Sequence, residues 1–277
     1  MLDTIRFPRS VSFCLGLTLA LLSGCTTARK TAPKTHTFFP PAPDEPRVQF
    51  LMTFSSERDL GGKSTFADFV TGKSSGVSPL VKPYGLCLRD GKLYVCDTLA
   101  GGIQVFDLVK NRSRWFMPRG EGRMQTPINI TIDGDGTRYV TDTGRNQVLI
   151  YGSDETWLGA IGMKDEMKPA DIALTAERLY ISDVKGHCVK VYSKAQRELL
   201  FTIPRDPKGA EGKLFSPTNL ALDPQGRLLV SDGGAFAVQV YDGDGKFLRT
   251  IGQQGVAPGL FARPKGVAVD SLGNIYV

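Results

Sequence analysis

The chain has 277 residues, of which 41% are hydrophobic and 22% are charged, and its formal net charge at pH 7 is +6. Lysine and arginine are scattered among aspartate and glutamate, a pattern that favours solubility over an electrostatic surface for nucleic acids. We therefore expect no nucleic-acid partner.

The N-terminus has the features of an export signal. Arg6 and Arg9 precede an apolar stretch, residues 11–22, which is too short to span a bilayer but suits the core of a signal peptide. Residues 22–25, Leu-Ser-Gly-Cys, resemble the lipobox of bacterial lipoproteins, which implies cleavage before Cys25 and a diacylglycerol on its sulfur. We expect residues 1–24 to be a lipoprotein signal peptide; an ordinary signal peptide with an incidental cysteine is the alternative.

Lipidation at Cys25 predicts a membrane-anchored protein of the bacterial cell envelope. Several acyl chains on one residue give stable anchoring where a single chain does not. Thr26 follows the cysteine, and the lack of aspartate there resembles sorting to the outer membrane over the inner membrane, with a periplasmic or a surface-facing orientation left open. Residues 25–46 contain five prolines and no periodic apolar face, which predicts a lipidated tether of roughly 60 Å at about 3.1 Å per residue.

Two segments precede the repetitive part of the chain. Residues 47–54 resemble an outer strand without a blade of its own, and we expect this strand to close a ring; a simple packing strand is the alternative. Residues 59–82 form an insertion in which Phe66, Phe69 and Val70 share one side of a predicted helical turn. Packing onto the ring is its expected role, and docking of a partner is the alternative.

A segment of about forty-five residues recurs from residue 83 onwards, a period typical of propellers and solenoids. Its copies begin at Pro83, Pro127, Pro169, Pro217 and Pro264, giving steps of 44, 42, 48 and 47 residues by subtraction of these numbers. Each copy has the four extended segments that one propeller blade needs. We predict an all-β propeller over residues 47–277, with four complete blades and part of a fifth.

The copy that begins at Pro217 shows the expected strands most clearly, at residues 219–223, 227–232, 238–241 and 247–252. The first two are nearly continuous apolar runs, which indicates strands covered on both faces. The third alternates apolar and polar residues, which indicates one packed face and one face that is wet or directed at the rim. The inner strands are therefore expected first in each copy, and the outer strands last.

The fifth copy carries the motif on which a family resemblance depends. Residues 264–277 contain Pro-Lys-Gly, an apolar run that ends in Asp270, a turn, and Asn-Ile-Tyr-Val, and this sequence resembles the repeat of NHL-repeat β-propellers. The resemblance implies a ring of six four-stranded blades. Because the fifth copy stops at Val277, it also implies a C-terminally truncated propeller that lacks on the order of seventy residues at this period.

Three polar residues stand where the repeat usually has glycine, namely Asn129, Asp171 and Asn219. They are the candidate ligand-binding residues, because equivalent positions at the start of inner strands face the mouth of the central channel. One interpretation is structural substitution, since asparagine and aspartate tolerate the left-handed backbone conformation of glycine. The other is that their oxygens hold Ca²⁺, as in the gluconolactonase-like and strictosidine-synthase-like propellers that the fold resembles.

The cysteines indicate no redox framework. Cys14 lies in the predicted signal and Cys25 is the predicted anchor, which leaves three others. Cys87 and Cys96 are expected to be small core residues, diagonal across a hairpin and too far apart for an easy disulfide. Cys188 is expected to be partly exposed. The chain has no haem-attachment motif, so we expect no c-type haem of its own.

The remaining reactive residues indicate no catalytic centre. The two histidines, His36 and His187, are too few for a multi-histidine zinc site. An aspartate recurs at the end of the second strand of each copy, where we expect it to cap the following turn. These aspartates are Asp97, Asp142, Asp183 and Asp232.

The sequence therefore favours a lipid-anchored, non-catalytic β-propeller without a cofactor, which binds a protein partner or ligand in the cell envelope. The alternative is a Ca²⁺-dependent lactonase or related hydrolase with Asn129, Asp171 and Asn219 at the channel mouth. A third hypothesis is an envelope assembly component for redox proteins, because lipoproteins that this chain resembles occur beside multihaem cytochromes.

Overall fold

The computed structural model describes residues 37–60, 79–163, 165–206, 209 and 211–277, in two units that divide between Met52 and Thr53. The predicted signal peptide, Cys25, His36 and residues 61–78 of the predicted insertion lie outside the described residues. Helical structure in the described ranges consists of two 3-10 turns, η1 (Glu57–Leu60) and η2 (Gly120–Gly122). None of it has the length or apolar character of a membrane-crossing helix.

The first unit contains one antiparallel strand pair. β1 (Thr37–Phe39) pairs with β2 (Val48–Phe50), so that Thr37 faces Phe50 and Phe39 faces Val48. The residues of both strands are exposed. β2 lies within residues 47–54, and closure of a ring by that segment stays a prediction.

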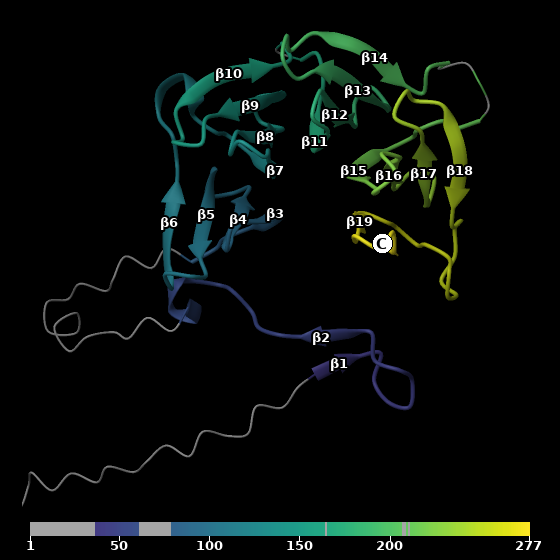
Figure 1. The fold of residues 1–277 in the computed structure, drawn as a ribbon, viewed down its shortest axis with the longest axis horizontal. Helices are drawn as coiled ribbons and strands as arrows, with labels where there is room; N and C mark the ends of the chain where they lie inside the picture. Colours follow the sequence, from purple (N-terminus) through teal and green to yellow (C-terminus); the bar gives the residue numbers. More distant parts are fainter. Residues whose placement is uncertain (1–36, 61–78, 164, 207–208, 210) are drawn as a thin grey trace, which may run out of the picture. The chain divides into compact units, whose positions relative to one another are not determined.

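The second unit is a β-propeller of four-stranded antiparallel blades, as the sequence predicts (Figure 1). Blade 1 contains β3 (Pro83–Arg89), β4 (Lys92–Asp97), β5 (Gly102–Asp107) and β6 (Arg112–Phe116). Blade 2 contains β7 (Pro127–Ile132), β8 (Arg138–Asp142), β9 (Gln147–Tyr151) and β10 (Trp157–Ile161). Blade 3 contains β11 (Pro169–Leu174), β12 (Arg178–Asp183), β13 (Cys188–Ser193) and β14 (Leu199–Ile203). Blade 4 contains β15 (Pro217–Leu222), β16 (Leu228–Asp232), β17 (Ala237–Tyr241) and β18 (Phe247–Ile251), and β19 (Ala268–Val269) pairs with β20 (Ile275–Tyr276) after it.

The strands of each blade run from the centre outward. In Figure 1, β3, β7, β11 and β15 surround the centre, and β6, β10, β14 and β18 lie at the periphery. The first strands of neighbouring blades contact one another around this centre. The prediction that inner strands come first in each copy is therefore confirmed.

The apolar core is divided into clusters that lie between neighbouring blades. Between blades 1 and 2, Phe116 meets Tyr151 edge to face, with ring centroids 5.0 Å apart, beside the buried side chains of Ile103 and Leu149. Similar clusters lie between blades 2 and 3 and between blades 3 and 4. A blade with neighbours on both sides thus buries both faces of its middle strands.

This packing corrects the prediction that one side of the third strand is wet or directed at the rim. All of β17 is buried, including Gln239, which is 7% exposed. The side-chain oxygen of Gln239 accepts a hydrogen bond from the Thr250 hydroxyl at 2.7 Å, which lowers the cost of burying this amide. The polar residue in this strand is therefore explained by a side-chain hydrogen bond to the outer strand β18 and not by contact with solvent.

The recurring aspartates lie buried at the end of each second strand and bond to backbone on two sides. Asp142 accepts hydrogen bonds from the amides of residues 125–126, which precede β7, and of residues 144–145, which follow β8, at 2.6 to 3.0 Å. Matching bonds are made by Asp97, Asp183 and Asp232. The predicted turn-capping role is confirmed, and each carboxylate also holds the loop that leads into its blade.

Candidate functional site

Three inner strands bring polar side chains together at the central channel. Asn129 on β7, Asp171 on β11 and Asn219 on β15 each occupy the third position of their strand. The structure brings all three into hydrogen-bond contact, and we name them the Asp171 cluster. Their meeting follows from the contacts between first strands, which place equivalent positions side by side.

Asp171 is the hydrogen-bond acceptor at the centre of this cluster, and it is 5% exposed. Its Oδ1 accepts from Asn129 Nδ2 at 2.6 Å and from the Ile172 amide at 2.7 Å. Its Oδ2 accepts from the Leu220 amide at 2.8 Å and from Asn219 Nδ2 at 3.4 Å. One carboxylate thereby ties blades 2, 3 and 4 together through four N–H donors.

Burial decides the protonation of this carboxyl group. Loss of hydration raises the pKa of Asp171 from its usual 3.8 to about 6, although the four hydrogen bonds favour the ionised form and oppose the change. The group is therefore ionised at neutral pH and titrates in mildly acidic solution.

Hydroxyl groups behind the cluster hold the inner strands together, a role that the sequence analysis missed. Ser182 Oγ accepts a hydrogen bond from the Asp171 amide at 2.8 Å and donates one to the Thr218 carbonyl of the next blade at 2.9 Å. Thr141 makes equivalent bonds between blades 2 and 3. The sequence signal is a serine or threonine directly before the recurring aspartate.

The structure corrects the interpretation that these residues replace glycine for its left-handed conformation. None of Asn129, Asp171 and Asn219 is among the described residues with positive φ. Gly85 holds the same position in blade 1, and a Cβ there would lie 2.3 Å from Asn129 Oδ1 and 2.4 Å from the Ile128 carbonyl oxygen. The absence of a side chain at Gly85 thus allows the first strand of blade 2 to lie close to the first strand of blade 1.

Gly85→Ala should lower the free energy of unfolding by about 2 kcal/mol, because the new methyl group must displace backbone of blade 2. The matched control is Gly266→Ala, at the same position in the fifth copy, where a Cβ meets no atom within 4 Å. Urea unfolding of both variants measures the difference. Equal stabilities of the two variants would show that the backbone of blade 2 moves away from the new methyl group without loss of stability.

Asp171 itself does not present a free oxygen to a cation. Both carboxylate oxygens of Asp171 face N–H groups, and Asn129 Oδ1 accepts from the Ile130 amide at 2.9 Å. Ca²⁺ takes about six to eight oxygen ligands, so its binding to Asp171 would require the N–H donors that now bond to this carboxylate to be displaced. Within the described ranges, no group of three or more His, Cys, Asp or Glu residues is placed to hold a metal ion.

A cavity of about 520 Å³ adjoins the cluster at the channel. The Asp171 cluster forms its polar part, and Tyr84, Leu86 and Val267 contribute apolar surface. A cavity of this size and mixed character is typical of small-ligand sites. Cys87 also lines it, as a free thiol whose pKa is raised by burial.

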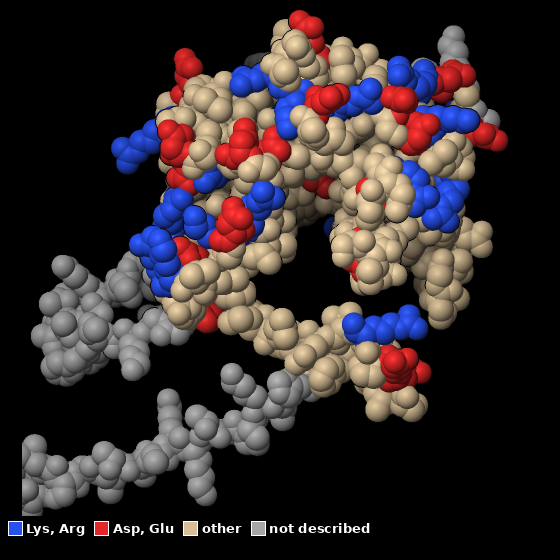
Figure 2. Space-filling view, viewed as in Figure 1, with Lys and Arg blue, Asp and Glu red and all other residues tan. Residues whose placement is uncertain are grey.

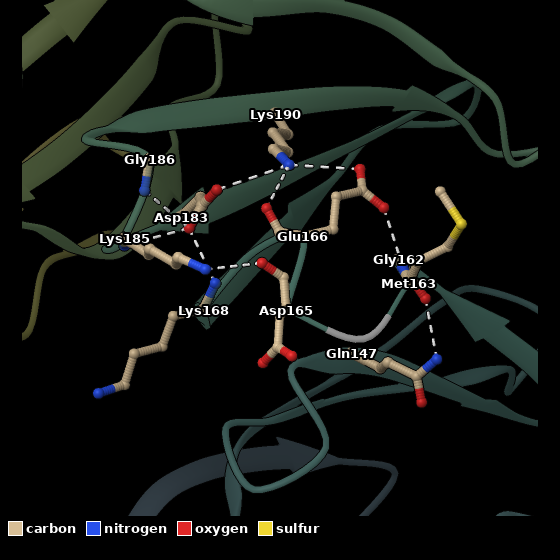
Figure 3. A network of polar contacts seen from close by, with 10 residues as sticks. All are labelled: Gln147, Gly162, Met163, Asp165, Glu166, Lys168, Asp183, Lys185, Gly186 and Lys190. Atoms are coloured by element: carbon tan, nitrogen blue, oxygen red, sulfur yellow. Dashed lines mark hydrogen bonds and ion pairs between the residues drawn. The ribbon is translucent and has the colours of Figure 1, made fainter.

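A second polar network joins blade 3 to the loop that precedes β11 (Figure 3). Lys190 Nζ lies 3.6 Å from Asp183 Oδ2 and 3.4 Å from Glu166 Oε1, and the lysine side chain is 12% exposed. Burial raises the pKa of the neighbouring Cys188 thiol to about 11, so this cysteine is a poor nucleophile. The sequence analysis missed Lys190, because a single lysine within a strand is not part of any recognisable sequence motif.

Two further residues that the sequence singles out, His187 and Cys96, lie apart from both networks. His187 is an exposed loop residue with φ of 51°, and its Nδ1 contacts the Phe215 carbonyl. Cys96 is fully buried as a free thiol, in agreement with its predicted place in the core.

No protein-family model matches this chain. Similar solved structures include virginiamycin B lyase from Staphylococcus aureus (TM-score 0.54, 13% identity, 70% of this chain and 62% of the lyase). A gluconolactonase from Xanthomonas campestris has a TM-score of 0.54 at 20% identity, over 71% of this chain and 70% of the enzyme. A protein of unknown function from Bacteroides thetaiotaomicron has a TM-score of 0.55 at 18% identity, over 72% and 53% of the two chains.

These similarities concern the fold. The chain spans less than two thirds of the staphylococcal lyase, and the identities lie between 13% and 20%. The β-propeller fold is shared by two enzymes of different activity and by a protein of unknown function, so the fold by itself assigns no activity to this chain.

Proposed function

We propose that this protein is a lipid-anchored NHL-type β-propeller of the bacterial cell envelope, which binds a ligand or a protein partner at its channel mouth and catalyses no reaction. The observation that carries this proposal is the hydrogen bonding of Asp171. A catalytic acid or base needs an oxygen directed at substrate or water, and a metal ligand needs a free lone pair. Both Asp171 oxygens instead accept N–H donors from within the fold.

The cavity beside the Asp171 cluster supports the proposal that this site binds a ligand or partner. It offers polar groups at one side and exposed apolar groups at the other, with Tyr84 48% and Leu86 65% exposed. Photo-crosslinking in living cells tests this role, with a benzophenone amino acid at Tyr84 and, as a control of matched exposure on the outer strand β10, at Leu158, which is 45% exposed. We expect a discrete adduct from position 84 alone, and no adduct from either position would count against the proposal.

The anchoring part of the proposal depends on Cys25 and has its own test. Mass spectrometry of the membrane-extracted protein should find an acylated N-terminal residue derived from Cys25, and Cys25→Ser should abolish both the modification and the cleavage. An unmodified N-terminus elsewhere in the chain would refute the anchor without affecting the binding role.

A Ca²⁺-dependent lactonase or related hydrolase is the second candidate. It is favoured by the convergence of three oxygen-bearing side chains at the channel mouth and by a gluconolactonase with the same fold. The discriminating assay follows hydrolysis of gluconolactone and other sugar lactones by the whole chain, with Ca²⁺ and with chelator, for the natural protein and Asp171→Ala. We expect rates at the uncatalysed level in every case; turnover that requires both Ca²⁺ and Asp171 would establish the hydrolase.

A further inference from the structure

A basic groove lies in blade 1, away from the channel mouth. It is a cavity of about 400 Å³ along β4, β5 and β6, and its charged lining consists of Lys92, Asp107, Lys110, Arg112 and Arg114. Four positive charges minus one negative charge leave +3 on this lining. Figure 2 shows lysine and arginine side chains gathered over the side of the molecule where Figure 1 places β5 and β6.

Strand register places these cations on one face of the blade. Lys92 pairs with Asp107, and Asp107 pairs with Arg112, so the three form a row across β4, β5 and β6. Arg114 follows two residues after Arg112 on β6 and therefore points to the same face. Lys110 comes from the turn between β5 and β6, next to this row.

These four cations are only partly neutralised within the fold. Arg114 is engaged, because its guanidinium binds both carboxylate oxygens of Glu155 on blade 2. Arg112 Nε lies 3.9 Å from Asp107 Oδ2, a single long contact. The ion pairs formed by the described residues include neither Lys92 nor Lys110. Three positive groups thus share one nearby carboxylate.

The corresponding groove between blades 2 and 3 has a different charge. Its lining includes Arg178 and Lys194 against Asp133, Asp135 and Glu177, so that two positive and three negative charges give −1. Lys194 Nζ bonds to Asp133 Oδ2 at 2.7 Å and is neutralised there. The basic groove is therefore a property of blade 1 and not a consequence of the repeat.

We propose that the blade 1 groove binds a phosphate-bearing anion. Ammonium groups and a planar guanidinium donate charge-assisted hydrogen bonds to phosphate oxygens, and the cavity has the size of a small-molecule site. Two sources share this chemistry, a soluble phosphate ester and the phosphodiester headgroup of an anionic lipid. The site depends neither on the lipid anchor nor on the Asp171 cluster.

Calorimetric titration of the full chain in neutral detergent at low ionic strength tests the site, with inorganic pyrophosphate and with glycerophosphoglycerol as probes. We expect saturable binding that weakens as salt is added. The double variant Lys110→Ala/Arg112→Ala should bind at least tenfold more weakly. The matched control, Lys246→Ala/Arg249→Ala, removes two exposed cations from the equivalent turn and outer strand of blade 4 and should bind as the natural protein does.

The two probes separate the sources of the anion. Tighter binding of pyrophosphate assigns the groove to a soluble phosphate ester, and tighter binding of the diester assigns it to a lipid headgroup; either result supports the site. The proposal is overturned by a natural protein that saturates with neither probe, by equal losses in the two double variants, or by binding of a DNA oligonucleotide alone.

Discussion

Asp142→Ala is expected to lower the free energy of unfolding by about 4 kcal/mol. The carboxylate is fully buried and accepts four backbone hydrogen bonds, from residues 125–126 and residues 144–145. Alanine leaves these partly buried N–H groups without an acceptor. A fully buried unpaired donor costs about 1 to 3 kcal/mol, and the four donors together stay below four times that amount because water reaches some of them. Urea unfolding at pH 7 measures the loss.

Two further variants show that the loss arises from these bonds. Asp142→Asn keeps the shape but turns one acceptor into a donor that faces backbone N–H groups, so an intermediate loss is expected. Asp242→Ala is the control, because Asp242 accepts the Asp244 and Lys246 amides in an exposed turn where water replaces it. Equal losses for Asp142→Ala and Asp242→Ala would mean that burial adds nothing to these bonds.

The same bonds explain why the blade boundaries could be predicted from sequence. β7 begins at Pro127, directly after the residues that Asp142 holds, and the other complete blades begin at the equivalent prolines. The turn between the first two strands of blade 1 could also be predicted, because it depends only on neighbouring residues. Asp90 and Gly91 have φ of 50° and 68°, and Arg89 pairs with Lys92 across them, as a two-residue hairpin requires. Both features depend on residues close in sequence or repeated at a fixed spacing.

What could not be predicted depends on contacts between blades. The burial of Gln239 follows from a neighbouring sheet and a bond to Thr250, neither of which its own strand reveals. The sequence predicted which three positions form the Asp171 cluster. It did not predict which side chains donate hydrogen bonds and which accept them. Only the structure shows that residues 42 and 48 positions away in sequence direct their amide N–H groups at the carboxylate. The left-handed interpretation failed because it considered each residue without the adjacent blade.

Asp171 should make the protein more stable in mildly acidic solution, in contrast to carboxylates whose pKa the fold lowers. Its pKa is raised from 3.8 in the unfolded chain to about 6 in the fold, so the folded state binds more protons between these values. Its contribution is therefore fully present below pH 4 and is lost as pH rises through 6, a change of about 3 kcal/mol. Burial raises the pKa of Asp97, but its backbone hydrogen bonds together outweigh this and lower it, and a backbone hydrogen bond lowers the pKa of Glu166. The contributions of these two groups are instead lost as pH falls below about 4.

The comparison of the natural protein with Asp171→Asn isolates this effect, because asparagine does not titrate and all other groups are shared. The difference between their free energies of unfolding, natural minus variant, should fall by about 2.4 kcal/mol between pH 4 and pH 7, on top of a constant offset from the altered hydrogen bonds. A flat difference would mean that the four N–H donors outweigh burial and keep the carboxyl at its usual pKa. A fall would confirm that blades 2, 3 and 4 are joined by a carboxylate that is charged at neutral pH although it is poorly hydrated.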